Sequence, residues 1–469
     1  MLFNSFGFIV FFLAVLGLYY SPITWTNKKR MLLLASYLFY AMWNPPLILL
    51  LWISTLVDWT AGNKLYRETD PRKRKMWLYL SILVNLGFLA FFKYGEFLLE
   101  NFTFLVNSVG MEFQAASPDI LLPMGISFYT FQTMSYTIDM YYKRNEPART
   151  FLDFALFVTF FPQLVAGPIV RAPELIPQFY APRKATVKQF LWGSFLLTLG
   201  LFEKVILADV LLSKTADTAF GAGKVLHSVD AWAGTLAFSG QIFFDFAGYS
   251  TCAIGIALML GIFLPDNFKY PYGAIGFSDL WKRWHITLSS WLRDYLYIPL
   301  GGNRKGPTRT YINLALTMLL GGLWHGAAWT FVVWGGLHGF YLMAERYLKK
   351  HVTLKINAWN GFVLALLTYT CVNITWVFFR AREFGTAMDM LGSMFMINSG
   401  EKVVPSLDLL ITFVVITLLF LTHWVMRNTS VRAVAEKTPW WLLSIVWSVM
   451  LFLLVIAQTN GEQFIYFQF

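Results

Sequence analysis

Residues 319–339 read LLGGLWHGAAWTFVVWGGLHG, and this stretch decides the kind of fold to expect. The run is apolar enough to be buried, yet it contains His325, His338 and several glycines. Glycine has no Cβ, so these positions let a substrate approach the backbone. A histidine kept away from water stays neutral near pH 7, and a neutral imidazole is the form that a general base needs. The stretch therefore indicates a broken membrane segment that holds a candidate catalytic group.

The composition of the whole chain agrees with a membrane location. Of its 469 residues, 57% are hydrophobic and only 13% are charged, whereas soluble domains carry about 25% charged residues. The formal net charge is +11, and the basic residues lie in the gaps between apolar runs, as in cytoplasmic loops. No separate basic domain with interleaved aromatic residues exists, so nucleic-acid binding is not indicated. We expect a polytopic integral membrane protein in contact with lipid.

Apolar runs long enough to cross a membrane recur along the chain, since about 20 residues span the hydrocarbon core. The clearest candidates are 3–20, 76–95, 187–212, 311–345 (broken), 359–379, 406–426 and 439–457. Shorter or interrupted runs lie at 31–61, 119–141, 151–170 and 231–264. We expect an all-α protein of about 11 transmembrane helices with re-entrant or interfacial pieces. The apolar runs follow one another closely, so residues 1–469 are predicted to form a single membrane domain.

Charge asymmetry predicts the orientation of the N-terminal half. The gap 62–75 carries six basic residues, whereas 96–118 carries none and contains glutamates instead. Basic residues accumulate on the cytoplasmic side. We therefore expect 21–30, 62–75 and 142–150 in the cytoplasm, and 96–118 outside.

Polar residues inside apolar runs are costly and mark candidate functional positions. Gln241 and Asp245 are four residues apart and would share a helix face, either along a channel or in a helix–helix hydrogen bond. Residues 281–304 are too polar to span and are predicted to lie at the interface or as a re-entrant element, with His285 inside. The basic residues of this segment are candidates for lipid headgroups or for an anionic donor. They are Lys282, Arg283, Arg293 and Arg304, with Lys305 directly after the segment.

His285, His325 and His338 could also suggest a metal site. His325 and His338 are thirteen residues apart, and no carboxylate follows at the usual spacing. Acid–base chemistry is therefore favoured, and no metal or bound cofactor is predicted.

Several stretches together resemble the membrane-bound O-acyltransferase (MBOAT) superfamily, and most closely its bacterial alginate O-acetyltransferase (AlgI-like) branch. The motif core spans about 119–345. The stretches are LPMGISFYTFQTMSYTIDMYY at 122–142, FFPQLVAGPIVR at 160–171, FDFAGYSTCAIGIALMLG at 244–261, PDNFKYPY at 265–272, LWKRWHITLSSWLRDYLYIPLGGNR at 280–304, LLGGLWHGAAWTFVVWGGLHG at 319–339 and WVFFRA at 376–381. The resemblance covers nearly the whole chain.

The resemblance implies an O-acetyltransferase with a helical core around a central channel. The invariant histidine of the family matches His325, and its second conserved polar position matches His285. Gln241, Asp245 and Arg293 are weaker candidates for the channel wall, and acetyl-CoA is the expected donor substrate. Relatives of this branch act in the bacterial inner membrane with an extracytoplasmic SGNH-type acetyltransferase, which O-acetylates a polysaccharide such as alginate, peptidoglycan or cellulose.

Two other functions stay open from the residues alone. A passive transporter or channel for an acyl carrier would also have broken helices and buried polar residues, although transporters often show internal symmetry and this chain does not. A lipid-linked sugar transferase would need acidic residues for a metal or a base, and these are sparse here.

Overall fold

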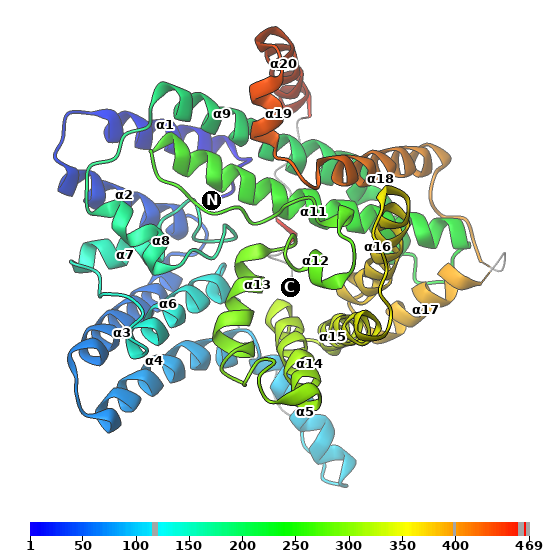
Figure 1. Ribbon diagram of the computed structural model, residues 1–469, viewed down its shortest axis with the longest axis horizontal. Helices are drawn as coiled ribbons and strands as arrows, with labels where there is room; N and C mark the ends of the chain where they lie inside the picture. Colours follow the sequence, from blue (N-terminus) through cyan, green and yellow to red (C-terminus); the bar gives the residue numbers. More distant parts are fainter. Residues whose placement is uncertain (115–120, 397–399, 458–463, 466–469) are drawn as a thin grey trace. The chain divides into compact units, whose positions relative to one another are not determined.

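The computed structural model describes residues 1–114, 121–396, 400–457 and 464–465, and within these ranges the chain is helical and forms no β-strand. Leu226 and Glu401 make one isolated bridge. The all-α prediction is therefore confirmed for the described part of the chain (Figure 1). Two predictions fall partly outside these ranges. They concern residues 115–118 of the segment 96–118 predicted to lie outside the cell, and residues 119–120 of the motif core.

Among the described residues, five helices are long and apolar enough to cross a membrane, judged by length and composition. They are Pro45–Arg67, Pro71–Phe92, Ser228–Met259, Ala358–Arg380 and Ser406–Met426. Two shorter apolar helices, Phe6–Tyr20 and Trp440–Ile456, match two further predicted spans. The multi-pass character is thus supported, while the count of about 11 stays a prediction.

Internal contacts divide the chain into two compact units. Unit 1 contains Met1–Gly193 and Ile256–Pro265, and unit 2 contains Ser194–Gly255 and Asp266–Phe469. The helix α9 (Val187–Leu201) crosses this division. The single membrane domain predicted for residues 1–469 stays a prediction.

Unit 1 is built from helices with clear sequence signals at their ends. They are α1 (Phe6–Tyr20), α2 (Trp25–Ala41), α3 (Ile48–Arg67), α4 (Pro71–Phe92), α5 (Gly95–Ser108), α6 (Ile126–Tyr141), α7 (Phe151–Thr159) and α8 (Ala172–Leu175). The interruption predicted within 31–61 lies at Asn44-Pro45-Pro46, which separates α2 from α3 because proline lacks a backbone N–H. Asp70 caps α4, and its side chain accepts from the Arg72 backbone N–H at 2.8 Å.

A buried carboxylate joins three helices of unit 1. Asp58 on α3 accepts from Ser81 Oγ at 2.5 Å and Asn85 Nδ2 at 2.8 Å, both on α4, and from Thr137 Oγ1 on α6 at 3.3 Å. Buried charge is tolerated only where hydrogen bonds replace water. This network therefore fixes how α3, α4 and α6 pack.

Unit 2 carries the residues of the candidate site. Its helical elements are η3 (Phe202–Ser213), α10 (Lys214–Phe220), α11 (Ser228–Met259), η4 (Pro271–Gly273), α12 (Phe277–Leu280), α13 (Ile286–Leu292), η5 (Arg293–Tyr297), α14 (Gly306–His325), α15 (Trp329–His351), α16 (Ala358–Arg380), α17 (Phe384–Phe395), α18 (Ser406–Met426), α19 (Val431–Lys437) and α20 (Trp440–Ile456). The break predicted within 311–345 is confirmed, because α14 ends at His325 and α15 begins at Trp329. Residues 281–304 form only short helical pieces, as their polarity predicts.

Helices α14 and α15 pack against each other through glycines. A Cβ on Gly322 would collide with the carbonyl oxygen of Phe331 and come within 3.0 Å of Gly335, and a Cβ on Gly335 would collide with the carbonyl oxygen of Met318. The glycines of the 319–339 stretch therefore serve close helix packing. This packing places the end of α14 beside the start of α15.

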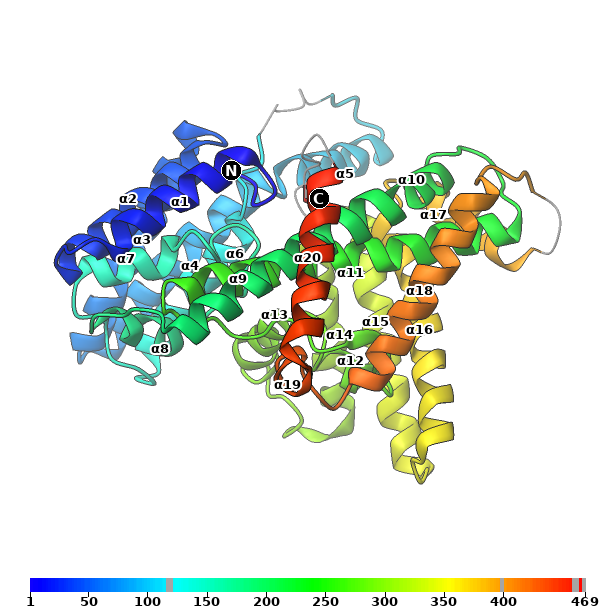
Figure 2. The same ribbon diagram turned by 90° about the horizontal axis from the view of Figure 1, so that it is seen from above.

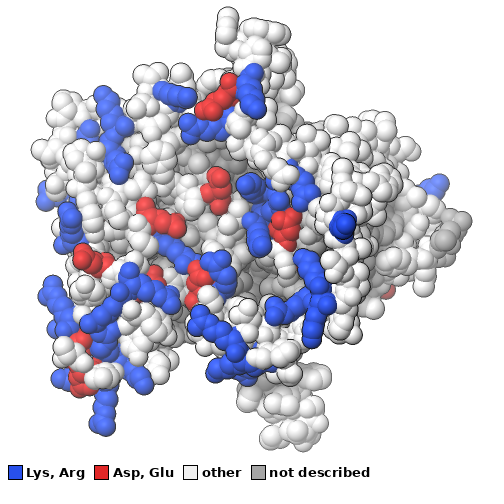
Figure 3. Space-filling view, viewed as in Figure 1, with Lys and Arg blue, Asp and Glu red and all other residues white. Residues whose placement is uncertain are grey.

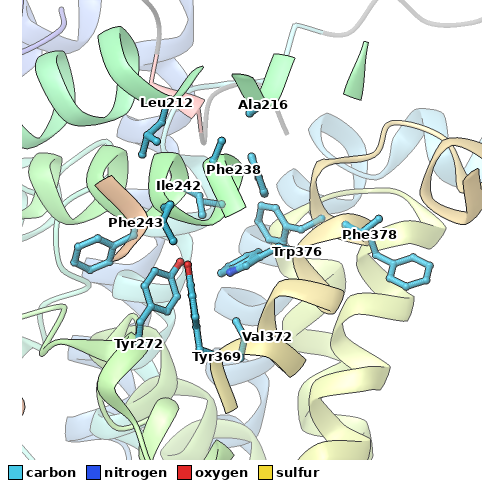
Figure 4. Close-up of a cluster of buried hydrophobic side chains, with 14 of the residues drawn as sticks. Leu212, Ala216, Phe238, Ile242, Phe243, Tyr272, Tyr369, Val372, Trp376 and Phe378 are labelled. Atoms are coloured by element: carbon cyan, nitrogen blue, oxygen red, sulfur yellow. The ribbon is translucent and has the colours of Figure 1, made fainter. Parts of the chain in front are cut away.

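An aromatic core holds α11, α16 and α18 together. Helices α16 and α18 lie side by side in both ribbon views (Figure 1, Figure 2), and the Tyr369 and Phe420 rings stack 5.6 Å apart. The hydroxyls of Tyr272 and Tyr369 point toward the same part of α11 (Figure 4), where they bond to the Ser239 backbone oxygen at 2.5 Å and Ser239 Oγ at 2.7 Å.

Candidate active site

His325 is the last residue of α14, and the local sequence explains why the helix ends there. Gly326 is extended, with φ −159° and ψ 151°, and a Cβ at this position would collide with the ring of Phe331. The His325 side chain is 4% exposed and lies among aromatic rings. Its ring centre is 5.0 Å from that of Trp334 and 5.4 Å from that of Phe379.

His285 lies beside His325, with their ring centres 6.5 Å apart. It precedes α13 with a left-handed backbone, φ 43°, which is uncommon for a residue other than glycine. Such strained positions cluster at functional sites. The structure therefore brings together the two histidines that the sequence predicts as catalytic, although their chemical roles stay predictions.

Asn267 fixes the orientation and the tautomer of His285. The Thr287 backbone N–H, which can only donate, points to Asn267 Oδ1 at 3.3 Å, so this atom is the amide oxygen. His285 Nδ1 lies 3.1 Å from the same oxygen and must therefore carry the proton. On the other side, Asn267 Nδ2 donates to Ser250 Oγ at 3.2 Å. The lone pair of His285 is thus on Nε2, as a proton acceptor requires. Asn267 lies in the stretch PDNFKYPY at 265–272, and the sequence alone did not predict its role.

The polar residues of α11 are buried in a charged cluster. Lys204 Nζ lies 2.5 Å from Asp245 Oδ1 and 2.8 Å from Asp209 Oδ1. The other oxygen, Asp245 Oδ2, accepts from the Ile465 backbone N–H at 2.8 Å. Gln241 is buried one turn before Asp245, and within the described residues its Oε1 has no hydrogen-bond partner. A channel-lining role for Gln241 and Asp245 stays a prediction.

Lys204 and Asp209 were missed in the sequence for a geometric reason. They lie five residues apart in η3, which is a π-helix. A π-helix bonds residue i to residue i+5, so it brings these positions together, whereas an ordinary helix turn does not. The spacing of three or four residues that is typical of ion pairs on an α-helix therefore does not predict this pair.

The candidate donor-binding cations differ in their surroundings. Arg283 is held by Asp279, Nε to Oδ1 at 2.9 Å, and donates to the Arg427 backbone oxygen at 2.8 Å. Arg293 is exposed and pairs with its neighbour Asp294 at 2.6 Å. The remaining three, Lys282, Arg304 and Lys305, are exposed. Basic side chains gather over α12 and around the N-terminal end of α14 (Figure 3). Donor binding by these residues stays a prediction.

In the described part of the chain, no group of three or more His, Cys, Asp and Glu side chains is arranged to hold a metal ion. His338 lies farther along α15 and bonds to Thr375 rather than to either of the other two histidines.

Comparisons with known proteins show the family to which this chain belongs. The family model of MBOAT, the membrane-bound O-acyltransferase family, matches residues 141–379, which include all three histidines. The chain is 42% identical over 399 residues to the "Probable alginate O-acetylase AlgI" of Pseudomonas putida, covering 84% of this chain and 80% of that protein. It is 39% identical over 431 residues to the peptidoglycan O-acetyltransferase of Helicobacter pylori, covering 85% and 80%. A teichoic acid D-alanyltransferase of Bacillus subtilis is 28% identical over 284 residues, covering 56% of this chain and 69% of that protein.

The apolar helices and the buried pair of histidines are those of a multi-pass membrane enzyme. The chain belongs to the membrane-bound O-acyltransferase family, in its AlgI-like branch, and is an O-acetyltransferase.

Proposed function

We propose that the protein takes an acetyl group from cytoplasmic acetyl-CoA and passes it across the bacterial inner membrane, where an extracytoplasmic polysaccharide is O-acetylated. The observation that carries this proposal is the pair of buried histidines, 6.5 Å apart, one of them held by Asn267 in a tautomer with a lone pair on Nε2. The similarity to alginate and peptidoglycan O-acetylating enzymes supports polysaccharides of these kinds as acceptors.

In the proposed reaction, the acceptor hydroxyl oxygen attacks the thioester carbonyl carbon while His325 takes the hydroxyl proton. A tetrahedral intermediate forms, the C–S bond breaks, and the imidazolium of His325 returns the proton to the coenzyme A thiolate. An ester and a free thiol result, with no change in oxidation state. A base of this kind contributes roughly 10²–10⁴ in rate.

His285 supports this step as a second proton acceptor or as an orienting group for the acceptor hydroxyl. In the described ranges, the links between helices are short. In this proposal a separate extracytoplasmic SGNH-type acetyltransferase supplies the hydroxyl that is acetylated first and then completes the transfer to the polysaccharide.

Inside-out membrane vesicles from cells that make the full chain, its partner and the polymer test this proposal. The vesicles receive acetyl-CoA with one label on the acetyl group and a second label on the adenine. We expect the acetyl label in the polymer inside the vesicles and the adenine label outside as free coenzyme A. Entry of both labels together would establish a passive channel, and failure of the acetyl label to reach the polymer would refute the proposed donor.

A further inference from the structure

His338 lies in an aromatic compartment next to the candidate catalytic histidines. It is 2% exposed, and its ring centre is 4.6 Å from that of Trp334 and 5.2 Å from that of Trp281. Trp334 in turn contacts His325, with ring centres 5.0 Å apart. His338 and the proposed base, His325, therefore contact the same indole ring.

The hydrogen bonds of Thr375 determine which nitrogen of His338 carries the proton. Thr375 Oγ1 donates its only proton to the Val372 backbone oxygen at 2.7 Å. His338 Nε2 lies 3.1 Å from the same Oγ1, and with the hydroxyl proton on the shorter bond to Val372 we assign Nε2 as the donor in this contact. The lone pair of the imidazole is therefore on Nδ1, which faces away from Thr375.

Nδ1 of His338 is a buried acceptor without a hydrogen-bond partner among the described residues. An unpaired buried acceptor destabilises a fold, so its retention calls for a compensating contact. The hydrogen bond to Thr375 explains how the His338 ring is held in place. It does not provide a donor for Nδ1. A ligand that brings an N–H donor would satisfy it.

The indole rings around His338 supply hydrogen-bond donors. The Nε1 atoms of Trp281, Trp334 and Trp376 are buried and have no acceptor within the described residues. The Trp334 and Trp376 rings stack 6.0 Å apart, and Trp281 meets Trp334 at 5.9 Å. Buried tryptophans ordinarily find an acceptor for this N–H. One acceptor and several donors in one compartment complement a secondary amide, which offers one N–H and one carbonyl oxygen.

We infer that His338 is a positioning residue that accepts a hydrogen bond from the amide N–H of the donor's carrier arm, while the surrounding indoles face the amide oxygen. The inference rests on the proposed function, because coenzyme A carries a secondary amide two carbons from its sulfur. A single indole ring, that of Trp334, separates His338 from His325, and two carbons separate the amide nitrogen from the thioester sulfur. Binding the amide here holds the thioester carbonyl beside the base.

The test compares acetyl-CoA with an analogue in which an ester oxygen replaces the N–H of the amide nearest the sulfur. Both donors are given to the vesicles described above. We expect the wild-type chain to use acetyl-CoA about tenfold better in kcat/KM, the range of one lost hydrogen bond to a buried group. In His338→Phe the preference should disappear, because acetyl-CoA falls to the level of the analogue while the analogue itself changes little.

Thr375→Val is the second variant, since it keeps the side-chain shape but removes the atom that fixes the tautomer. It should reduce the preference, whereas Thr375→Ser should retain it. A wild-type chain that uses both donors equally would overturn the inference without reference to any variant, and so would a His338→Phe chain that keeps the preference. A chain that does not use acetyl-CoA at all would instead refute the proposed function, and the inference with it.

Discussion

Replacing His325 by glutamine tests whether this histidine acts as a base or has only a structural role. Glutamine keeps a polar side chain of similar reach but cannot shuttle a proton at neutral pH. The side chain is 4% exposed at the end of α14, so the change leaves the buried volume and the helix end nearly intact. Transfer of the acetyl label should fall by roughly 10²–10⁴, the contribution of a general base. At about 1.4 kcal/mol per tenfold, this corresponds to about 3–5 kcal/mol of lost transition-state stabilisation.

His423 offers a matched control on α18. It is also buried, and its Nδ1 accepts from the Tyr272 backbone N–H at 3.2 Å, a bond that a glutamine oxygen can replace. His423→Gln should therefore keep activity within a few-fold of wild type. Both variants are compared at equal amounts of membrane-inserted protein, measured by quantitative immunoblot. If His325→Gln retained most of the acetyl transfer, His325 would not be the base, and His285 or a passive channel would have to be considered in its place.

Three further outcomes follow from the structure. Neutralising the exposed cations Lys282, Arg304 and Lys305 should raise the KM for acetyl-CoA more than it lowers kcat, if they bind donor phosphates; an unchanged KM in steady-state kinetics would exclude them. Asp58→Ala should lower the stability of the purified chain by roughly 3 kcal/mol, because several buried donors lose their acceptor, and an unchanged midpoint of thermal unfolding in detergent would contradict this. A cysteine placed within 62–75 should resist an impermeant thiol reagent in intact cells, whereas one placed in the helix α5 region should react; the reverse pattern would invert the topology.

The helices of this protein were largely predictable because their limits depend on local chemistry. The predicted span 406–426 coincides with α18, and 359–379 differs from α16 by one residue at each end. The break in 311–345 follows from Gly326, and the break after α2 follows from Pro45 and Pro46. The conformational freedom of glycine and the fixed φ of proline act within a few residues, so a pattern along the chain is enough to detect them.

The partners of the site residues were not predictable in the same way. Asn267 contacts His285 at the point where His285 itself takes a left-handed backbone conformation, directly before α13. Lys204 meets Asp209 because η3 has π-helical geometry, and neither feature has a distinct sequence signal here. The candidate histidines were found from residue type and motif, but what orients them depends on contacts between distant segments.

Those contacts give the site its chemical definition. A neutral imidazole can accept a proton at only one nitrogen, and second contacts decide which one. Asn267 gives His285 its lone pair on Nε2, and Thr375 gives His338 its lone pair on Nδ1. The two acceptors are thus fixed before any substrate binds, and no rearrangement of protons is needed when a thioester arrives. Hydrogen bonds outside the reacting groups therefore contribute to the preorganisation of the site.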